Sequence, residues 1–173
     1  LIATIGHGSD GLIFSGHTDT VPYDEALWQS DPFKLTKREG RYFGLGSCDM
    51  KSFIAMAITA SQKFDPEKFI HPLTIVATAD EETTMSGARL LAENEKKLGR
   101  FCVIGEPTNL TPVREHKGII MESIRFSGLS GHSSDPSLGN SALESMHEFI
   151  QQLLVYRTQL QQQFKNTAFE VST

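Results

Sequence analysis

The sequence predicts an α/β fold, with a layered βα domain built on a mixed, largely parallel sheet, followed by part of an α+β domain. Short apolar runs alternate with helical patterns over roughly the first two thirds of the chain. Several of those runs end in His or acidic residues, as expected where parallel strands finish at one edge of a sheet. Beyond Lys117 the pattern changes, and we therefore place the domains at 1–117 and 118–173.

The N-terminal part is predicted to contain strands at 1–5 and 11–16. They are joined by a turn rich in Gly, Ser and Asp, residues that tolerate a positive φ. A long polar loop is expected over 22–40, with a turn at Glu39-Gly40. A short strand follows over 41–46.

The middle of the chain gives the clearest elements. Apolar residues recur at helical spacing over 49–64, which predicts a helix covering one face of a sheet. The continuous apolar run 73–79 is typical of a strand that is buried on both faces. A second helix is predicted over 86–98, and 101–104 is predicted to be another central strand.

The C-terminal part is predicted to hold strands within 113–128, a polar loop over 128–136 and one long amphipathic helix. One stripe of that helix is apolar, and it consists of Leu143, Met146, Ile150, Leu153, Leu160 and Phe164. Ser141 and Glu144 fit a capping box at its start.

Composition excludes several classes of protein. Of the 173 residues 39% are hydrophobic, and the net charge is −5 without any basic run, so nucleic acid is not an expected partner. No apolar run is long enough to span a membrane. The two cysteines, Cys48 and Cys102, form no disulfide framework, which favours a reducing, cytoplasmic setting in which we expect both to be buried. The chain begins without Met inside a strand-like run, and we expect a piece of a longer protein.

Four residues near predicted strand ends form a candidate metal site: His17, Asp49, Glu82 and Glu106. If they were buried together, the carboxylates would repel one another and take up protons, and divalent cations would remove that penalty. Mixed nitrogen and oxygen ligands suit Zn²⁺, with Co²⁺ or Mn²⁺ as alternatives. Each residue alone has an ordinary explanation, as part of a polar turn, a helix cap or an acidic turn.

Three further residues are candidates for the catalytic chemistry. Asp19 could hydrogen-bond the second nitrogen of His17 and fix its tautomer. Glu81 is next to Glu82, and adjacent side chains diverge on extended backbone, so one could bind metal while Glu81 serves as a general base. His132 lies in a Ser/Gly loop, where a surface histidine is the simpler interpretation.

With these residues in view, the chain resembles the M20 family of co-catalytic zinc amidohydrolases. Five segments match its signatures in family order: 16–22 (GHTDTVP), 44–51 (GLGSCDMK), 79–82 (ADEE), 105–108 (GEPT) and 130–133 (SGHS). Cys48 and Ser52 differ from the residues that are usual at these positions in the family, but neither difference removes a ligand. The resemblance covers nearly the whole chain and implies a metal-binding catalytic domain followed by part of a lid and dimerisation domain.

The resemblance implies specific roles. His17, Asp49 and Glu106 would hold one zinc ion, Asp49 would bridge, and Glu82 would hold a second zinc ion. The same resemblance makes Glu81 the general base and acid, and Asp19 the residue that orients His17. It also implies a homodimer formed through the lid, in which His132 reaches the partner subunit's active site and stabilises an oxyanion. The second zinc's histidine lies beyond Thr173 in this family.

The implied substrate is a small N-acyl amino acid. Within the family, 31–36, 77–89 and 131–136 resemble the branch that hydrolyses N²-acetyl-L-ornithine to L-ornithine and acetate for arginine biosynthesis. The branch that removes succinyl groups from succinyl-diaminopimelate is the alternative. A second alternative, of a different class, is an inactive metal-binding fragment of the parent enzyme. A serine or cysteine hydrolase is disfavoured, because no nucleophile elbow is present.

Overall fold

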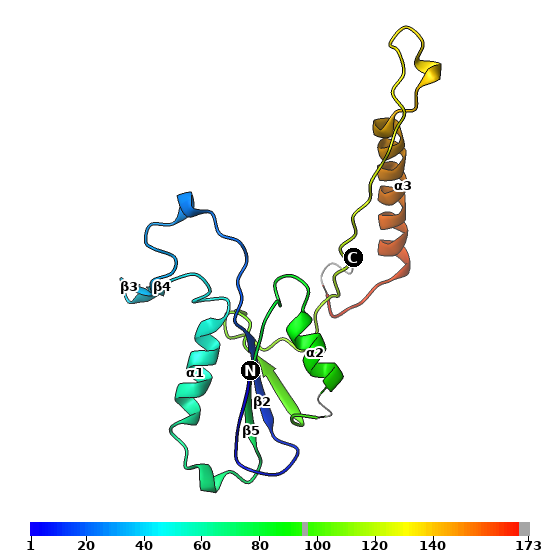
Figure 1. Cartoon of the computed structure of the whole chain (residues 1–173). Coiled ribbons are helices and arrows are strands. Elements are labelled where there is room, and N and C mark those ends of the chain that lie inside the picture. The colour runs from blue at the N-terminus through cyan, green and yellow to red at the C-terminus, as the bar shows by residue number, and fades with distance from the viewer. Residues whose placement is uncertain (95–96, 170–173) are drawn as a thin grey trace. The chain divides into compact units, whose positions relative to one another are not determined.

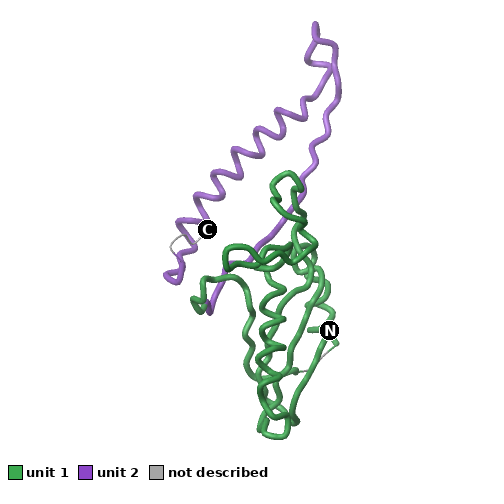
Figure 2. The backbone as a smooth tube through the Cα atoms, turned by 90° about the vertical axis from the view of Figure 1, so that its left-hand side faces the viewer, with its two compact units in different colours: residues 1–112 green, residues 113–173 purple. Residues whose placement is uncertain are grey.

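The computed structural model describes residues 1–94 and 97–169, which fall into two compact units, Leu1–Pro112 and Val113–Thr173. Figure 2 draws the two units in different colours. The expected boundary at 117/118, between a metal-binding domain and a lid domain, stays a prediction. Each unit is described by itself below.

The first unit is built on a four-stranded sheet in the order β1-β5-β2-β6 (Figure 1). β5 runs parallel to β2 and antiparallel to β1, and β6 runs parallel to β2. The predicted mixed, largely parallel sheet is therefore confirmed. The strands are β1 (Ile2–Ile5), β2 (Leu12–His17), β5 (Leu73–Thr78) and β6 (Phe101–Ile104).

The core lies along β5, whose first four residues are all buried. β5 has a neighbour on each side, because β1 and β2 both pair with it rather than with each other. Helix α1 (Lys51–Ser61) packs against β2 and β5 and buries Ala57. Met50, directly before the helix, is completely buried. The continuous apolar run at 73–79 therefore correctly predicted a central strand.

The expectation for β6 was wrong. β6 is an edge strand, and its four residues are exposed, because no other described segment pairs with its free side. Cys102 is consequently exposed rather than in the core, and Cys48 is exposed as well. An apolar run predicts a strand, but the neighbours of that strand decide whether it is central.

The two helices of the first unit differ from prediction mainly at their ends. α1 begins at Lys51, and Asp49 does not cap it, because the N-cap position is Met50 and no side chain caps the helix. The Asp49–Met50 peptide bond is cis. α2 (Ser86–Asn94) is confirmed at its start, while residues 95 and 96 of the predicted helix lie outside the described part of the chain.

A small hairpin occupies part of the segment that was predicted to be a polar loop. β3 (Thr36–Arg38) pairs antiparallel with β4 (Arg41–Phe43). The turn between them has φ of +52° at Glu39 and +73° at Gly40, as a two-residue type I′ turn requires. The turn was predicted and the first strand was not. Three short 3₁₀ helices are also present: η1 (Glu25–Leu27), η2 (Pro66–Lys68) and η3 (Pro136–Leu138).

The second unit contains one long helix, α3 (Ala142–Gln163), as predicted. The hydroxyl of Ser141 accepts a hydrogen bond from the backbone N–H of Glu144 at 3.3 Å, which confirms the predicted cap. The strands expected within 113–128 are not formed; the second unit has a single isolated bridge, between Leu129 and Asn140, among its described residues. Extended backbone becomes a strand only beside a hydrogen-bonding neighbour, and no described segment provides one for 113–128.

Of the helices in residues 1–94 and 97–169, none combines the length and the apolar character needed to cross a membrane.

Candidate metal centre

Three parallel strands have their C-terminal ends at the same edge of the sheet. β2 ends at His17, β5 is followed by 80–82, and β6 is followed closely by Glu106. Asp49 comes from the turn that leads into α1. Because parallel strands end at the same edge, residues far apart in the sequence meet there, as the pattern predicted.

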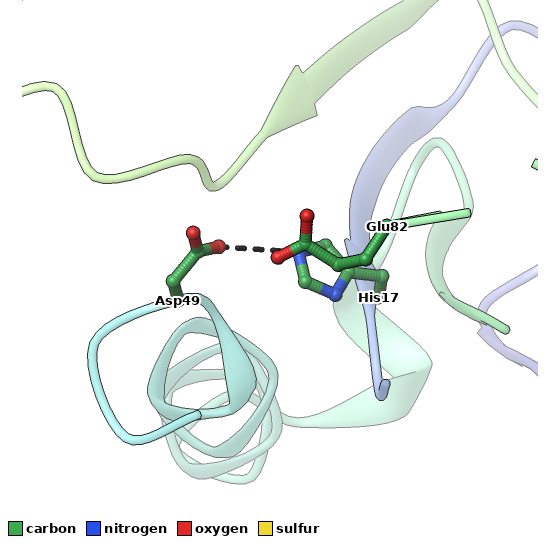
Figure 3. Close-up of side chains that lie close together, drawn as sticks. All are labelled: His17, Asp49 and Glu82. Atoms are coloured by element: carbon green, nitrogen blue, oxygen red, sulfur yellow. Dashed lines mark hydrogen bonds and ion pairs between the residues drawn. The ribbon is translucent and has the colours of Figure 1, made fainter. Parts of the chain in front are cut away.

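The centre of this cluster is His17, which is only 1% exposed. Its Nε2 lies 3.1 Å from Oδ1 of Asp49 and 3.9 Å from Oε1 of Glu106. One donor atom from each of His17, Asp49 and Glu82 lies within 4.8 Å of the others, so that the three could hold one metal ion. Figure 3 shows these three side chains directed toward one another.

The other ring nitrogen of His17 faces Asp19, and the details differ from the simplest expectation. Nδ1 lies 3.1 Å from the main-chain carbonyl oxygen of Asp19 and 3.6 Å from its carboxylate Oδ1. The closer partner is therefore the carbonyl, to which a protonated Nδ1 can donate. That tautomer leaves the lone pair of Nε2 free for a metal ion.

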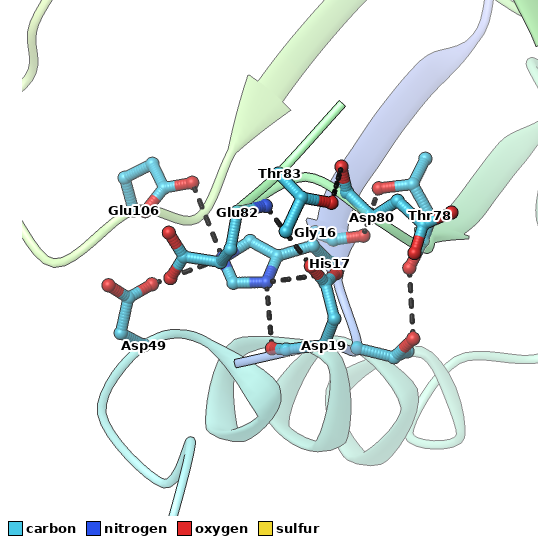
Figure 4. A network of polar contacts seen from close by, with 10 residues as sticks. Gly16, His17, Asp19, Asp49, Thr78, Asp80, Glu82, Thr83 and Glu106 are labelled. Atoms are coloured by element: carbon cyan, nitrogen blue, oxygen red, sulfur yellow. Dashed lines mark hydrogen bonds and ion pairs between the residues drawn. The ribbon is translucent and has the colours of Figure 1, made fainter. Parts of the chain in front are cut away.

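The carboxylate of Asp19 holds the backbone that follows β5. Its Oδ2 accepts a hydrogen bond from the N–H of Glu82 at 3.0 Å (Figure 4). Its Oδ1 is buried and is the one such side-chain atom in the described residues without a hydrogen-bond partner. Burial favours the protonated acid, but the N–H groups of Glu82 and Glu81 outweigh it and lower the pKa of Asp19. Asp19 therefore stays a carboxylate beside His17.

Without a cation, the close carboxyl groups of Glu82 and Glu106 favour their protonated, uncharged forms more than usual. Burial, followed by the charge of Asp49, raises the pKa of both Glu82 and Glu106. Burial alone would lower the pKa of His17, but the hydrogen bonds that its ring can donate to Asp19 and Asp49, together with the nearby acidic charges, raise it overall. One imidazole among several carboxylates is a donor set that suits zinc, so these residues fit a divalent metal ion.

Two residues for which the sequence analysis gave no role shape this edge. Thr78 accepts hydrogen bonds at its carbonyl from the N–H and the hydroxyl of Thr18, at 3.0 and 2.9 Å. Asp80 has φ of +58°, and its carbonyl accepts from Met85 N–H at 2.6 Å. The side chain of Asp80 also accepts a hydrogen bond from the hydroxyl of Ser86 at the start of α2. For Thr78 the only signal was a polar residue at the end of an apolar strand, whereas Asp80 also lies in the matched segment 79–82.

The remaining predicted residues lie as follows. Glu81 is half-buried, and its charge adds to the raised pKa of Glu82 and of Glu106 after burial and the charge of Asp49. His132 belongs to the second unit and is exposed, with Nδ1 2.6 Å from the hydroxyl of Ser134. The roles expected for these two residues stay predictions.

The fold and the site together describe a layered α/β protein with an imidazole–carboxylate cluster at the carboxyl edge of its sheet. The family model for Peptidase family M20/M25/M40 matches residues 13–170. The chain therefore belongs to this peptidase family.

Curated relatives and a solved structure are similar to the chain. Acetylornithine deacetylase of Proteus mirabilis is 51% identical over 99% of the chain and 44% of the relative. Acetylornithine deacetylase of Yersinia pestis is 52% identical over 96% of the chain and 43% of the relative. Human carnosine dipeptidase 1 superposes with a TM-score of 0.50 at 25% identity, over 61% of the chain and 24% of that structure. The chain thus spans less than half the length of these proteins.

Proposed function

We propose that the protein is a metal-dependent hydrolase that cleaves the amide bond of an N-acyl amino acid. The observation that carries the proposal is the convergence of His17, Asp49 and Glu82 within 4.8 Å in a member of this peptidase family. Asp19 and the strand ends hold these residues in place before any ion arrives.

Zinc is the proposed metal, with cobalt as an alternative. His17, Asp49 and Glu106 would hold one ion, Asp49 would bridge, and Glu82 would hold the second. Both Asp49 and Glu106 approach Nε2 of His17, which supports the first set. The bound metal would supply Lewis-acid polarisation of the acyl carbonyl and a water of lowered pKa.

Glu81 is the proposed general base and acid. It would take a proton from the attacking water as the water oxygen bonds to the acyl carbon. It would then return the proton to the nitrogen as the C–N bond breaks, which releases the carboxylic acid and the amine. Its place beside Glu82 supports this role, because Glu82 can bind metal while Glu81 stays free.

The proposed substrate is N²-acetyl-L-ornithine, which yields L-ornithine and acetate in arginine biosynthesis. The relatives named acetylornithine deacetylase, which are 51% and 52% identical to the chain, support this substrate. Both cysteines are free, which supports a cytoplasmic location. A desuccinylase has no comparable support among these relatives.

A homodimer formed through the second unit is also proposed, with His132 stabilising the oxyanion in the partner's site. α3 buries none of its residues and exposes Leu143 and Leu153, which supports a further surface packing there. The molar mass of the complete natural polypeptide, measured by light scattering, tests this. A monomer at micromolar concentration would contradict it.

The test of the main proposal is Glu81→Gln in the complete natural polypeptide. We expect kcat for acetylornithine to fall by about 10²–10⁴-fold, because proton transfer is lost. Zinc stoichiometry should stay unchanged, because Glu81 is not a proposed ligand. Glu67→Gln, in the exposed helix η2, is the matched control and should keep full turnover. Near-normal turnover by Glu81→Gln would remove the base assignment.

The 173-residue chain by itself is proposed to be inactive, because it spans only 44% of the Proteus mirabilis relative. We expect this isolated chain to bind zinc weakly and to release no acetate. Measurable deacetylation by the isolated chain would contradict this and would show that these 173 residues suffice for an active site.

A further inference from the structure

Two of the proposed metal ligands directly follow a glycine at a strand end. Gly16 precedes His17 and Gly105 precedes Glu106. Neither position has room for a side chain. A Cβ on Gly105 would lie 1.9 Å from Cγ of Phe53, and a Cβ on Gly16 would lie 2.9 Å from Cε of Met50.

The side chains that occupy this space come from the start of α1. A Cβ on Gly16 would also lie 3.1 Å from Cγ1 of Ile54, so the N-cap residue Met50 and the first turn of α1 both approach Gly16. Asp49, the proposed bridging ligand, immediately precedes Met50. The first turn of one helix therefore contacts the backbone beside two ligands and follows directly from a third.

The contact at Gly105 is supported on the side of the helix, because the ring of Phe53 packs edge-on against Phe14 of β2 with ring centroids 5.9 Å apart. The end of β6 has less support. Its last ladder bond joins Gly105 N–H to the carbonyl of Ser15 at 3.1 Å, and Glu106 lies beyond it. The ring of Phe53 therefore packs against the end of β6 at the point where its hydrogen bonds to β2 end.

We propose that Phe53 is a positioning residue: its ring, seated against Gly105, sets the place of Glu106 relative to His17 and Asp49 and so sets the affinity for the metal. This rests on the proposed metal centre. Glu106 Oε1 lies 3.9 Å from His17 Nε2. Metal ligands tolerate displacements of only a few tenths of an ångström, so a shift of the strand end is felt as weaker binding.

The two glycines differ in how much they constrain the site. At Gly16 the nearest atom is the far end of a flexible Met side chain, which can move aside. At Gly105 the nearest atoms are the ring carbons closest to the helix backbone, which cannot. Gly105 and Phe53 are therefore the sharper pair to test.

The experiment measures the zinc dissociation constant of the apo-protein by competition with a chromophoric chelator, in the complete natural polypeptide. Gly105→Ala should weaken zinc binding by about 10–100-fold, the range found when groups supporting metal ligands are lost. The double variant Gly105→Ala with Phe53→Ala should bind zinc more tightly than Gly105→Ala alone, because the colliding ring is gone. A loss of general packing would instead make the two defects add.

Gly118→Ala is the matched control, since no atom lies within 4 Å of a Cβ there and zinc affinity should not change. Thermal melting of each apo-variant establishes that it is folded. If Gly105→Ala does not fold, Phe53→Ala decides alone, with an expected loss of about tenfold.

Two results overturn the inference while leaving the proposed function intact: folded variants that bind zinc as tightly as the wild type, or a double variant no better than Gly105→Ala. A wild-type protein that binds no zinc overturns both. The failure of the inference is therefore distinguishable from the failure of the metal centre.

Discussion

Both ring nitrogens of His17 contact other residues of the candidate metal site. It is buried, its Nδ1 lies beside the carbonyl of Asp19, and its Nε2 faces Asp49. A proton and a metal ion compete for that Nε2, because only the neutral imidazole can be a ligand.

Zinc binding is therefore expected to release protons near neutral pH. Burial lowers the pKa of His17, but its hydrogen bonds to Asp19 and Asp49 and the nearby acidic charges raise it overall, so an incoming ion competes with a proton that this site favours. Affinity should fall as the pH is lowered through that pKa, and at higher pH the release should vanish. Titration calorimetry in buffers of different ionisation enthalpy measures the protons released. His71→Gln, at an exposed position, should leave the number unchanged. Binding without proton release at pH 7 would contradict the ligand role of His17.

At the level of elements, the sheet accounts for the placement of the site. β2, β5 and β6 are parallel and in register, so His17, residues 80–82 and Glu106 reach one edge. The fourth strand, β1, is antiparallel and ends elsewhere. Of the buried apolar residues in the described part of the chain, Leu73, Ile75 and Val76 belong to the inner strand β5, so its packing should control stability.

Ile75→Ala, at a position only 6% exposed in β5, should lower the free energy of unfolding by about 2–5 kcal/mol. The cost combines lost burial with the cavity left behind. Ile70→Ala is the matched control, because Ile70 is 88% exposed and the same change should cost less than about 0.5 kcal/mol. Denaturant unfolding measures both. Equal costs for the two variants would contradict the assignment of β5 as the core strand.

At the scale of the whole molecule, metal should act as a stabilising ligand. A ligand that binds only the folded state at 100 times its dissociation constant adds about 2.7 kcal/mol. Zinc should therefore raise the melting temperature of the complete natural polypeptide, and a chelator should reverse the shift. Asp49→Ala should abolish the response, because it removes the proposed bridging ligand. A zinc-induced shift that survives Asp49→Ala would place the stabilising ion elsewhere.

Sequence reasoning located the strands and helices of the first unit well where their patterns were local. The apolar run of β5, the helical spacing of α1 and the Glu39-Gly40 turn were all legible, because each depends on residues close together in the chain. The sequence did not predict that β6 is an edge strand or that 113–128 forms no strand. Whether a strand is central, or forms at all, depends on neighbours that a local pattern does not contain.

The sequence by itself determined which imidazole and carboxyl groups stand near the ends of parallel strands, because residue type and apolar patterning are properties of the chain. Only the tertiary structure decided how they meet. It gave Nδ1 of His17 the carbonyl of Asp19 as its nearer partner and seated Phe53 against Gly105. Both depend on distances of a few tenths of an ångström, which packing sets and a linear pattern cannot encode.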